Sequence, residues 1–113
     1  MTTRLTMIEF PSNDANASAQ FFKDAFTLEH LAYGPQYTDV QLGAEQTLGF
    51  QGDAGEAPAA PLVVLEVDDL TTVRADIEAA GGTITVEPFD FPGGRRMHFR
   101  EPGGNELAVW VRA

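Results

Sequence analysis

One histidine and two carboxylates stand where acid–base or metal chemistry could arise in this chain. His98 and Glu106 lie near the C-terminus, and Glu9 lies near the N-terminus. An imidazole can accept a proton near neutral pH, and imidazole and carboxylate groups both bind divalent metals. These three are the candidate catalytic residues, with His98 or Glu9 as a general base on an acidic C–H group. The alternative is that both carboxylates support a rim or a turn and that His98 is partly buried.

Other catalytic arrangements are missing from the sequence. It has no cysteine, which excludes thiolate chemistry and disulfides. It also lacks the G-x-S-x-G and G-x-G-x-x-G patterns, and its glycine pairs fall at predicted turns. His30 follows the first predicted helix, and we expect it on a solvated face.

The composition indicates one acidic globular domain. The 113 residues, 43% of them hydrophobic, can bury a single modest core. The net charge of −10 opposes binding to nucleic acid or to an anionic membrane surface. It favours a cationic small molecule or a basic protein surface, or else it serves solubility. No apolar run is long enough to span a bilayer and no signal pattern is visible, so we expect a cytoplasmic protein.

Hydrophobic patterns predict the elements that position these residues. A strand over residues 4–10 leads through Asp14, which can cap a helix, into a helix over residues 15–26. We expect this helix to turn one stripe inward, formed by Ala17, Phe21, Phe22 and Ala25. Three further strands are predicted over residues 28–33, 36–42 and 46–51.

The same order then begins again. A strand over residues 61–67 is followed by Asp68-Asp69 as a cap and by a helix over residues 70–80, which Gly81-Gly82 ends. The remaining elements are a strand over residues 83–87, a loop over residues 88–92 and a hairpin of strands over residues 95–100 and 106–111. This repeat indicates an internal duplication. We therefore expect a single domain over residues 1–113, with modules over about 1–52 and 61–113 and a linker over about 53–60.

Three segments resemble the vicinal-oxygen-chelate superfamily of glyoxalases, bleomycin-resistance proteins and dioxygenases. They are the final hairpin with its EPGGNEL turn, PSNDANASAQFFKDAF at the first helix, and VDDL with IEAAGG around the second. The turn departs mildly from the commoner DPDG or DPEG. The resemblance implies an α+β fold of two tandem βαβββ modules, whose curled mixed sheets form a cleft. It also implies pairing with a second copy, so we expect a homodimer.

Metal-dependent members of that superfamily carry His or Glu ligands at four strand positions. The resemblance places these positions at Met7, Gly49, Leu62 and Ala108. A thioether is a soft ligand and the other three residues have no side-chain donor, so none of them suits a hard divalent ion. We therefore expect no metal and no other cofactor. A displaced site formed by Glu9, His98 and Glu106 is the alternative.

Aromatic side chains near the implied cleft are the candidate ligand-binding residues, namely Phe50, Phe89, Phe91, His98 and Trp110. Aromatic faces stack on flat rings and hold cations, although in a small domain such residues can equally be core. Phe89 and Phe91 lie in a predicted loop, where core residues are less expected.

These features predict metal-independent binding of a small organic molecule, cationic or aromatic, in a dimer cleft. Such a function would resemble the drug sequestration of bleomycin-resistance-type proteins, and hence antibiotic resistance. The first alternative is a glyoxalase-like metal-dependent lyase or isomerase, or a dioxygenase, with displaced ligands. The others are an enzyme that uses side chains alone and a protein-binding module whose cleft is filled by side chains.

Overall fold

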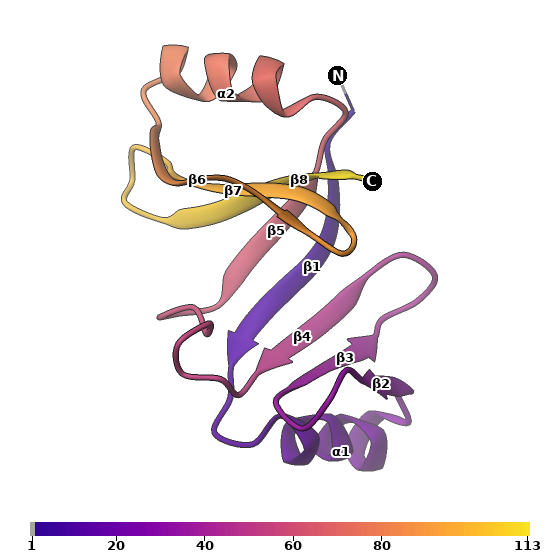
Figure 1. Cartoon of the computed structure of the whole chain (residues 1–113). Coiled ribbons are helices and arrows are strands. Elements are labelled where there is room, and N and C mark those ends of the chain that lie inside the picture. The colour runs from indigo at the N-terminus through magenta and orange to yellow at the C-terminus, as the bar shows by residue number, and fades with distance from the viewer. Residues whose placement is uncertain (1) are drawn as a thin grey trace. The chain divides into compact units, whose positions relative to one another are not determined.

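The computed structural model describes residues 2–113, which form two compact units (Figure 1). The first unit comprises residues 6–62, and the second comprises residues 63–113 together with residues 2–5. In chain order each half runs strand, helix and three strands, so the predicted α+β fold of two tandem βαβββ modules is confirmed. The predicted linker falls within residues 52–61, a segment between β4 and β5 that contains turns and bends but no helix or strand.

The first unit is a mixed sheet with a helix on one face. Its strands lie in the order β2 (His30–Ala32), β3 (Tyr37–Gln41), β4 (Thr47–Gln51) and β1 (Arg4–Pro11). β1 is parallel to β4, whereas β3 is antiparallel to both of its neighbours. Helix α1 (Ala15–Phe26) packs on the face that carries Val40 and Phe50.

The cap and the small residues of α1 set the face that it buries. The Asp14 carboxylate accepts a hydrogen bond from the backbone amide of Ala17 at 3.0 Å and begins the helix, as predicted. Ala15 and Ala19 are fully buried, and Phe22 packs beside them. The predicted inward stripe was therefore wrong except at Phe22. Two alanines let the helix approach the sheet closely, and Phe21, about 100° further round the helix, is left 60% exposed.

The second unit repeats this plan. Its strands lie in the order β5 (Leu62–Glu66), β8 (Glu106–Arg112), β7 (Gly94–Arg100) and β6 (Thr83–Phe91). Helix α2 (Leu70–Ala79) is capped by Asp69, which accepts from the Thr72 amide at 3.1 Å. The core between it and the sheet is formed by Val67, Leu70, Met97 and Val109. Neither described helix is long and apolar enough to cross a membrane.

The predicted loop over residues 88–92 was wrong, because β6 continues to Phe91. Pro88 favoured a loop, since proline cannot donate to a strand ladder. β6, however, lies at the edge of the strand order, and its register with β7 shifts between Val86 and Phe89. Proline is tolerated at such an irregular edge, so the strand is extended past it.

Candidate functional site

The second unit presents a face that α2 does not cover, and most of the candidate residues lie on it. Met97 on β7 and Val109 on β8 belong to the core under the helix. Because side chains alternate along a strand, the residues on either side of each point to the opposite face. Strand pairing places Phe89, Arg96, Trp110 and Glu66 in one row across the four strands. It places Val86, His98, Ala108 and Val64 in the next row. We call these two rows, with Phe91 and Glu106, the histidine face.

Polar side chains on the histidine face form a connected series. Nε of Arg96 donates to Nε2 of His98 at 2.9 Å. Nδ1 of His98 lies 3.6 Å from Oε2 of Glu106, and this oxygen accepts from the Thr85 hydroxyl at 2.6 Å. Because Nε2 accepts a hydrogen bond, the neutral ring carries its proton on Nδ1, facing the carboxylate.

His98 is held in its neutral form by its surroundings. Burial and the Arg96 guanidinium lower the pKa of His98, while the Glu106 carboxylate acts in the opposite direction. Its side chain is only 15% exposed. A neutral imidazole is a base, but here the Nε2 lone pair is already occupied by the hydrogen bond from Arg96.

Aromatic rings lie next to this polar series. The Phe89 ring centroid is 6.2 Å from that of His98, and Phe91 is 5.9 Å from Trp110. The Arg112 guanidinium carbon lies 5.3 Å from the centroid of the Trp110 ring. The structure therefore brings together four of the five predicted ligand-binding residues. Whether they bind a ligand stays a prediction.

Phe50 has a different environment. It is 6% exposed, and its ring stacks on Phe10 at 5.4 Å and lies 5.6 Å from Phe22, in the core beneath α1. These contacts leave almost no surface for a ligand. Strand alternation explains why Phe50 faces the core, because it is one residue from Gly49, which lies on the opposite face of the strand. His30, expected on a solvated face, is half-buried, and its Nδ1 has no hydrogen-bond partner within residues 2–113.

Glu66 and Arg112 form an ion pair that the sequence did not reveal. Arg112 donates to both oxygens of Glu66, at 2.9 and 3.1 Å, and Nη2 of Arg4 lies 3.4 Å from the same carboxylate. The hydrogen bonds from Arg112 hold the pKa of Glu66 below its ordinary value despite burial. Only the two-residue spacing of Arg112 from Trp110, and of Arg96 from His98, could have placed these arginines on the histidine face.

The face of the first unit that α1 does not cover carries Glu9, Gly49 and Asp39 in one row. A Cβ at Gly49 would lie 2.5 Å from the Tyr37 hydroxyl oxygen, 3.2 Å from Sδ of Met7 and 3.3 Å from Oδ1 of Asp39. The Tyr37 hydroxyl thus fills the space that a side chain at position 49 would need. Burial raises the pKa of Asp39, and the hydroxyl of Tyr37 partly offsets this effect.

The residues at the four metal-ligand positions do not fit a divalent metal. Met7, Gly49, Leu62 and Ala108 offer no hard donor, and Leu62 and Ala108 are buried. Within residues 2–113, no group of three or more His, Asp or Glu side chains is placed to hold a metal ion. Of the displaced set, His98 and Glu106 lie together, while Glu9 belongs to the first unit. The absence of a cofactor stays a prediction.

The sequence matches the family described as the Glyoxalase/Bleomycin resistance protein/Dioxygenase superfamily over residues 4–109. The chain therefore belongs to this superfamily, and the predicted resemblance is confirmed. No match was found among curated protein sequences.

Solved structures share the fold at low sequence identity. A hypothetical protein from Bacillus halodurans aligns with a TM-score of 0.82 and 12% identity, over 100% of this chain and 96% of its own. A Streptomyces coelicolor methylmalonyl-CoA epimerase in complex with 2-nitronate-propionyl-CoA aligns at 0.76 and 16%, over 100% and 99%. The Mn(II)-bound glyoxalase from Novosphingobium aromaticivorans aligns at 0.71 and 22%, over 97% of this chain and 40% of its own. Such identities establish the fold alone.

Substitution of Gly49 tests whether Tyr37 closes the position above it. Gly49→Ala should lower the free energy of unfolding by about 1 kcal/mol, because the new methyl group overlaps the hydroxyl. In a Tyr37→Phe background the same change should be neutral or stabilising, since the hydroxyl is gone and alanine suits a strand better than glycine. Urea unfolding of the four proteins measures this coupling. Equal effects of Gly49→Ala in both backgrounds would contradict the packing described.

The protonation of His98 predicts how stability depends on pH. The pKa of His98 is lowered in the folded protein, while in the unfolded chain it has the ordinary value of about 6.5. Below that pH the unfolded chain therefore binds more protons than the folded protein. Stability that is fully present above this pH should fall as the pH drops toward the folded pKa.

Arg96→Met should raise the His98 pKa in an NMR titration, and Glu106→Gln should lower it. Arg95→Met, which removes a guanidinium paired with Asp90, is the matched control and should leave the pKa unchanged.

Proposed function

We propose that this protein binds a small organic molecule with a flat aromatic ring on the histidine face, without a catalytic metal. The observation that carries the proposal is the arrangement of Phe89, Phe91 and Trp110 beside the Arg96–His98–Glu106 series. Binding sites for small molecules combine apolar and aromatic walls with a few positioned polar groups, and this face has both.

The contacts already present indicate what kind of ligand fits. The Arg112 guanidinium lies over the Trp110 ring, so the environment of this ring already suits a cation. Phe89 is 41% exposed at the edge strand, where its ring can stack on a ligand. The series from Thr85 to Arg96 offers donors and acceptors to polar substituents. The net charge of −10 favours a cationic ligand over an anionic one.

The superfamily includes bleomycin-resistance proteins, and the proposal extends to non-covalent sequestration of a drug by a homodimer. The lack of hard donors among Met7, Gly49, Leu62 and Ala108 supports a role without metal. No step of bond making or breaking is required for such a function.

Ligand binding can be tested with 1-methylquinolinium, a flat aromatic cation, and 2-naphthoate, a flat aromatic anion. The cation should raise the unfolding temperature, because a ligand that binds only the folded state stabilises it. Phe89→Ala should weaken its binding about fivefold through the loss of ring stacking. Phe26→Ala, which truncates an exposed phenylalanine of the first unit, should have no effect. No stabilisation by either compound, or equal effects of both substitutions, would count against the proposal.

A metal-dependent lyase or isomerase, or a dioxygenase, with displaced ligands is the second candidate. The structural similarity to the Mn(II)-bound glyoxalase favours it, and His98 with Glu106 would supply two donors. Elemental analysis separates the two candidates, using untagged protein incubated with Ni, Zn, Mn or Fe and then desalted. We expect well below one metal per chain. A stoichiometric metal that is lost in a His98→Ala variant would favour the second candidate.

A further inference from the structure

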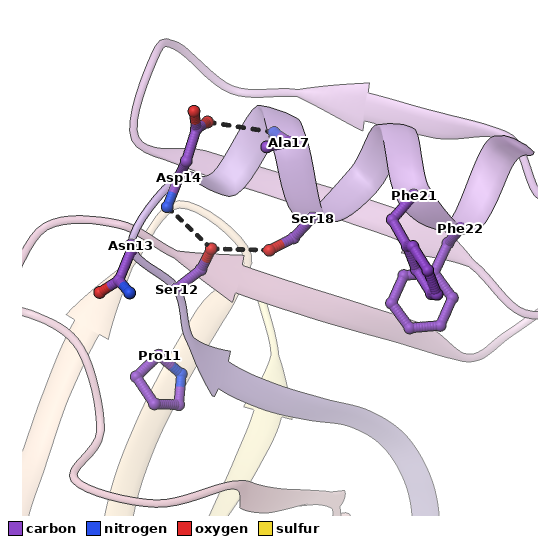
Figure 2. Close-up of a pocket in the computed structure, with 8 residues that line it drawn as sticks. All are labelled: Pro11, Ser12, Asn13, Asp14, Ala17, Ser18, Phe21 and Phe22. Carbon is purple, nitrogen blue, oxygen red and sulfur yellow. Dashed lines mark hydrogen bonds between the residues drawn. The ribbon is translucent and has the colours of Figure 1, made fainter.

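A separate pocket lies in the first unit, where β1 leads into α1 (Figure 2). Its volume is about 500 Å³, within the size range of small-molecule sites. Its lining residues are Pro11, Ser12, Asn13, Asp14, Ala17, Ser18, Phe21 and Phe22. None of them belongs to the histidine face.

The apolar part of the pocket is formed by rings. Figure 2 shows Phe21 and Phe22 on one side and Pro11 on the other. The two phenyl rings meet edge to face, with centroids 5.2 Å apart and planes at 88°. Phe21 remains 60% exposed, although Phe22 beside it packs on the core. An aromatic ring left at a pocket wall in this way is available to a ligand.

The polar part of the pocket is negative. Ser12 and Ser18 share a hydroxyl–hydroxyl hydrogen bond of 2.7 Å, and Ser12 also accepts from the Asp14 amide at 3.1 Å. The Asp14 carboxylate accepts from the Ala17 amide and so already satisfies the start of the helix. Asp14 is the only charged residue in the lining. An anion here would therefore face a carboxylate rather than free amides, whereas a cation would be attracted.

The surrounding charge acts in the same direction. Residues 6–62 carry eight acidic side chains and a single basic one, Lys23, which gives a net charge of −7. The other six basic residues of the chain lie outside this segment. A positively charged ligand would meet a favourable field over the whole first unit.

We propose that this pocket is a second binding site, for a small organic cation with an aromatic body such as an arylalkylamine. The aromatic ring would pack between Phe21, Phe22 and Pro11, and the ammonium group would bind at Asp14 and the serine hydroxyls. The ring walls and the isolated carboxylate together define this ligand class. The site is distinct from the proposed function, because its residues lie in the other unit.

The proposal can be tested with three compounds that share a phenylethyl-type body but differ in charge. These are 2-phenylethylammonium, neutral 2-phenylethanol and anionic 3-phenylpropionate, each titrated at pH 7 into isotope-labelled protein. The ammonium compound should shift the NMR signals of the backbone amides from Asn13 to Phe22. The alcohol should bind more weakly, and the carboxylate should not bind. Absence of shifts with the ammonium compound, or equal affinity for all three, would overturn the proposal.

Paired variants then locate the contacts. Phe21→Ala should weaken binding of the ammonium compound about fivefold, whereas Leu31→Ala, which truncates a similarly exposed apolar residue of the first unit outside the lining, should not. Asp14→Asn keeps a good helix cap but removes the charge, and should weaken binding about threefold. Asp69→Asn makes the same change at the cap of α2 and should have no effect. Equal effects within either pair would overturn the proposal.

Two further measurements distinguish a ligand site at this pocket from binding at the histidine face and from a dimer interface. Phe89→Ala should leave binding of the ammonium compound at the α1 pocket unchanged. The proposal for the histidine face and the proposal for this pocket can therefore fail independently of each other. Light scattering of wild type and Phe21→Ala tests whether a second copy covers the pocket instead. Loss of a dimer in the variant would assign Phe21 to an interface and overturn the small-molecule proposal.

Discussion

The packing of one capped helix across one face of each sheet is the constraint on which the rest of this structure depends. In the first unit Ala15, Ala19 and Phe22 cover Val40 and Phe50, and in the second Leu70 covers a core around Met97 and Val109. Burial of these apolar side chains commits alternate strand residues to the core. The residues between them point to the other face of the sheet, which in the second unit carries the Arg96–His98–Glu106 series and the Glu66–Arg112 ion pair.

The faces that the helices do not cover differ in their polar side chains. In the second unit a neutral histidine bridges a guanidinium and a carboxylate, so each partly buried polar group has a partner. In the first unit the tyrosine hydroxyl occupies the space above Gly49, beside a buried oxygen of Asp39 that has no hydrogen-bond partner within residues 2–113. Within residues 2–113, neither arrangement gathers three or more His, Asp or Glu side chains that could hold a metal ion.

The two units also differ in their balance of charged residues. Six of the seven basic residues lie in the second unit, where Arg112 and Arg4 neutralise the buried Glu66. The first unit keeps eight carboxylates and one lysine. The chain thus has one half rich in ion pairs and one half with a largely uncompensated negative field. This division strengthens the proposal of a cationic ligand at the α1 pocket, where one lysine offsets eight carboxylates.

The sequence by itself determined the order of elements, the acidic caps and the family, because these follow from local periodicity, capping chemistry and short motifs. Alternation along β7 and β8 also explains why His98, Glu106 and Trp110 share one side of a sheet. Phe89 and Phe91, which the sequence placed in a loop, join them because β6 continues to Phe91. Local patterns could not decide the phase of α1, the extension of β6 past Pro88 or the burial of Phe50. Those depend on contacts between distant segments: the close approach of Ala15 and Ala19 to the sheet, an irregular edge strand that tolerates proline, and the stacking of Phe50 on Phe10. The ion pair of Glu66 with Arg112 joins residues 46 positions apart, and only tertiary structure brings such groups together.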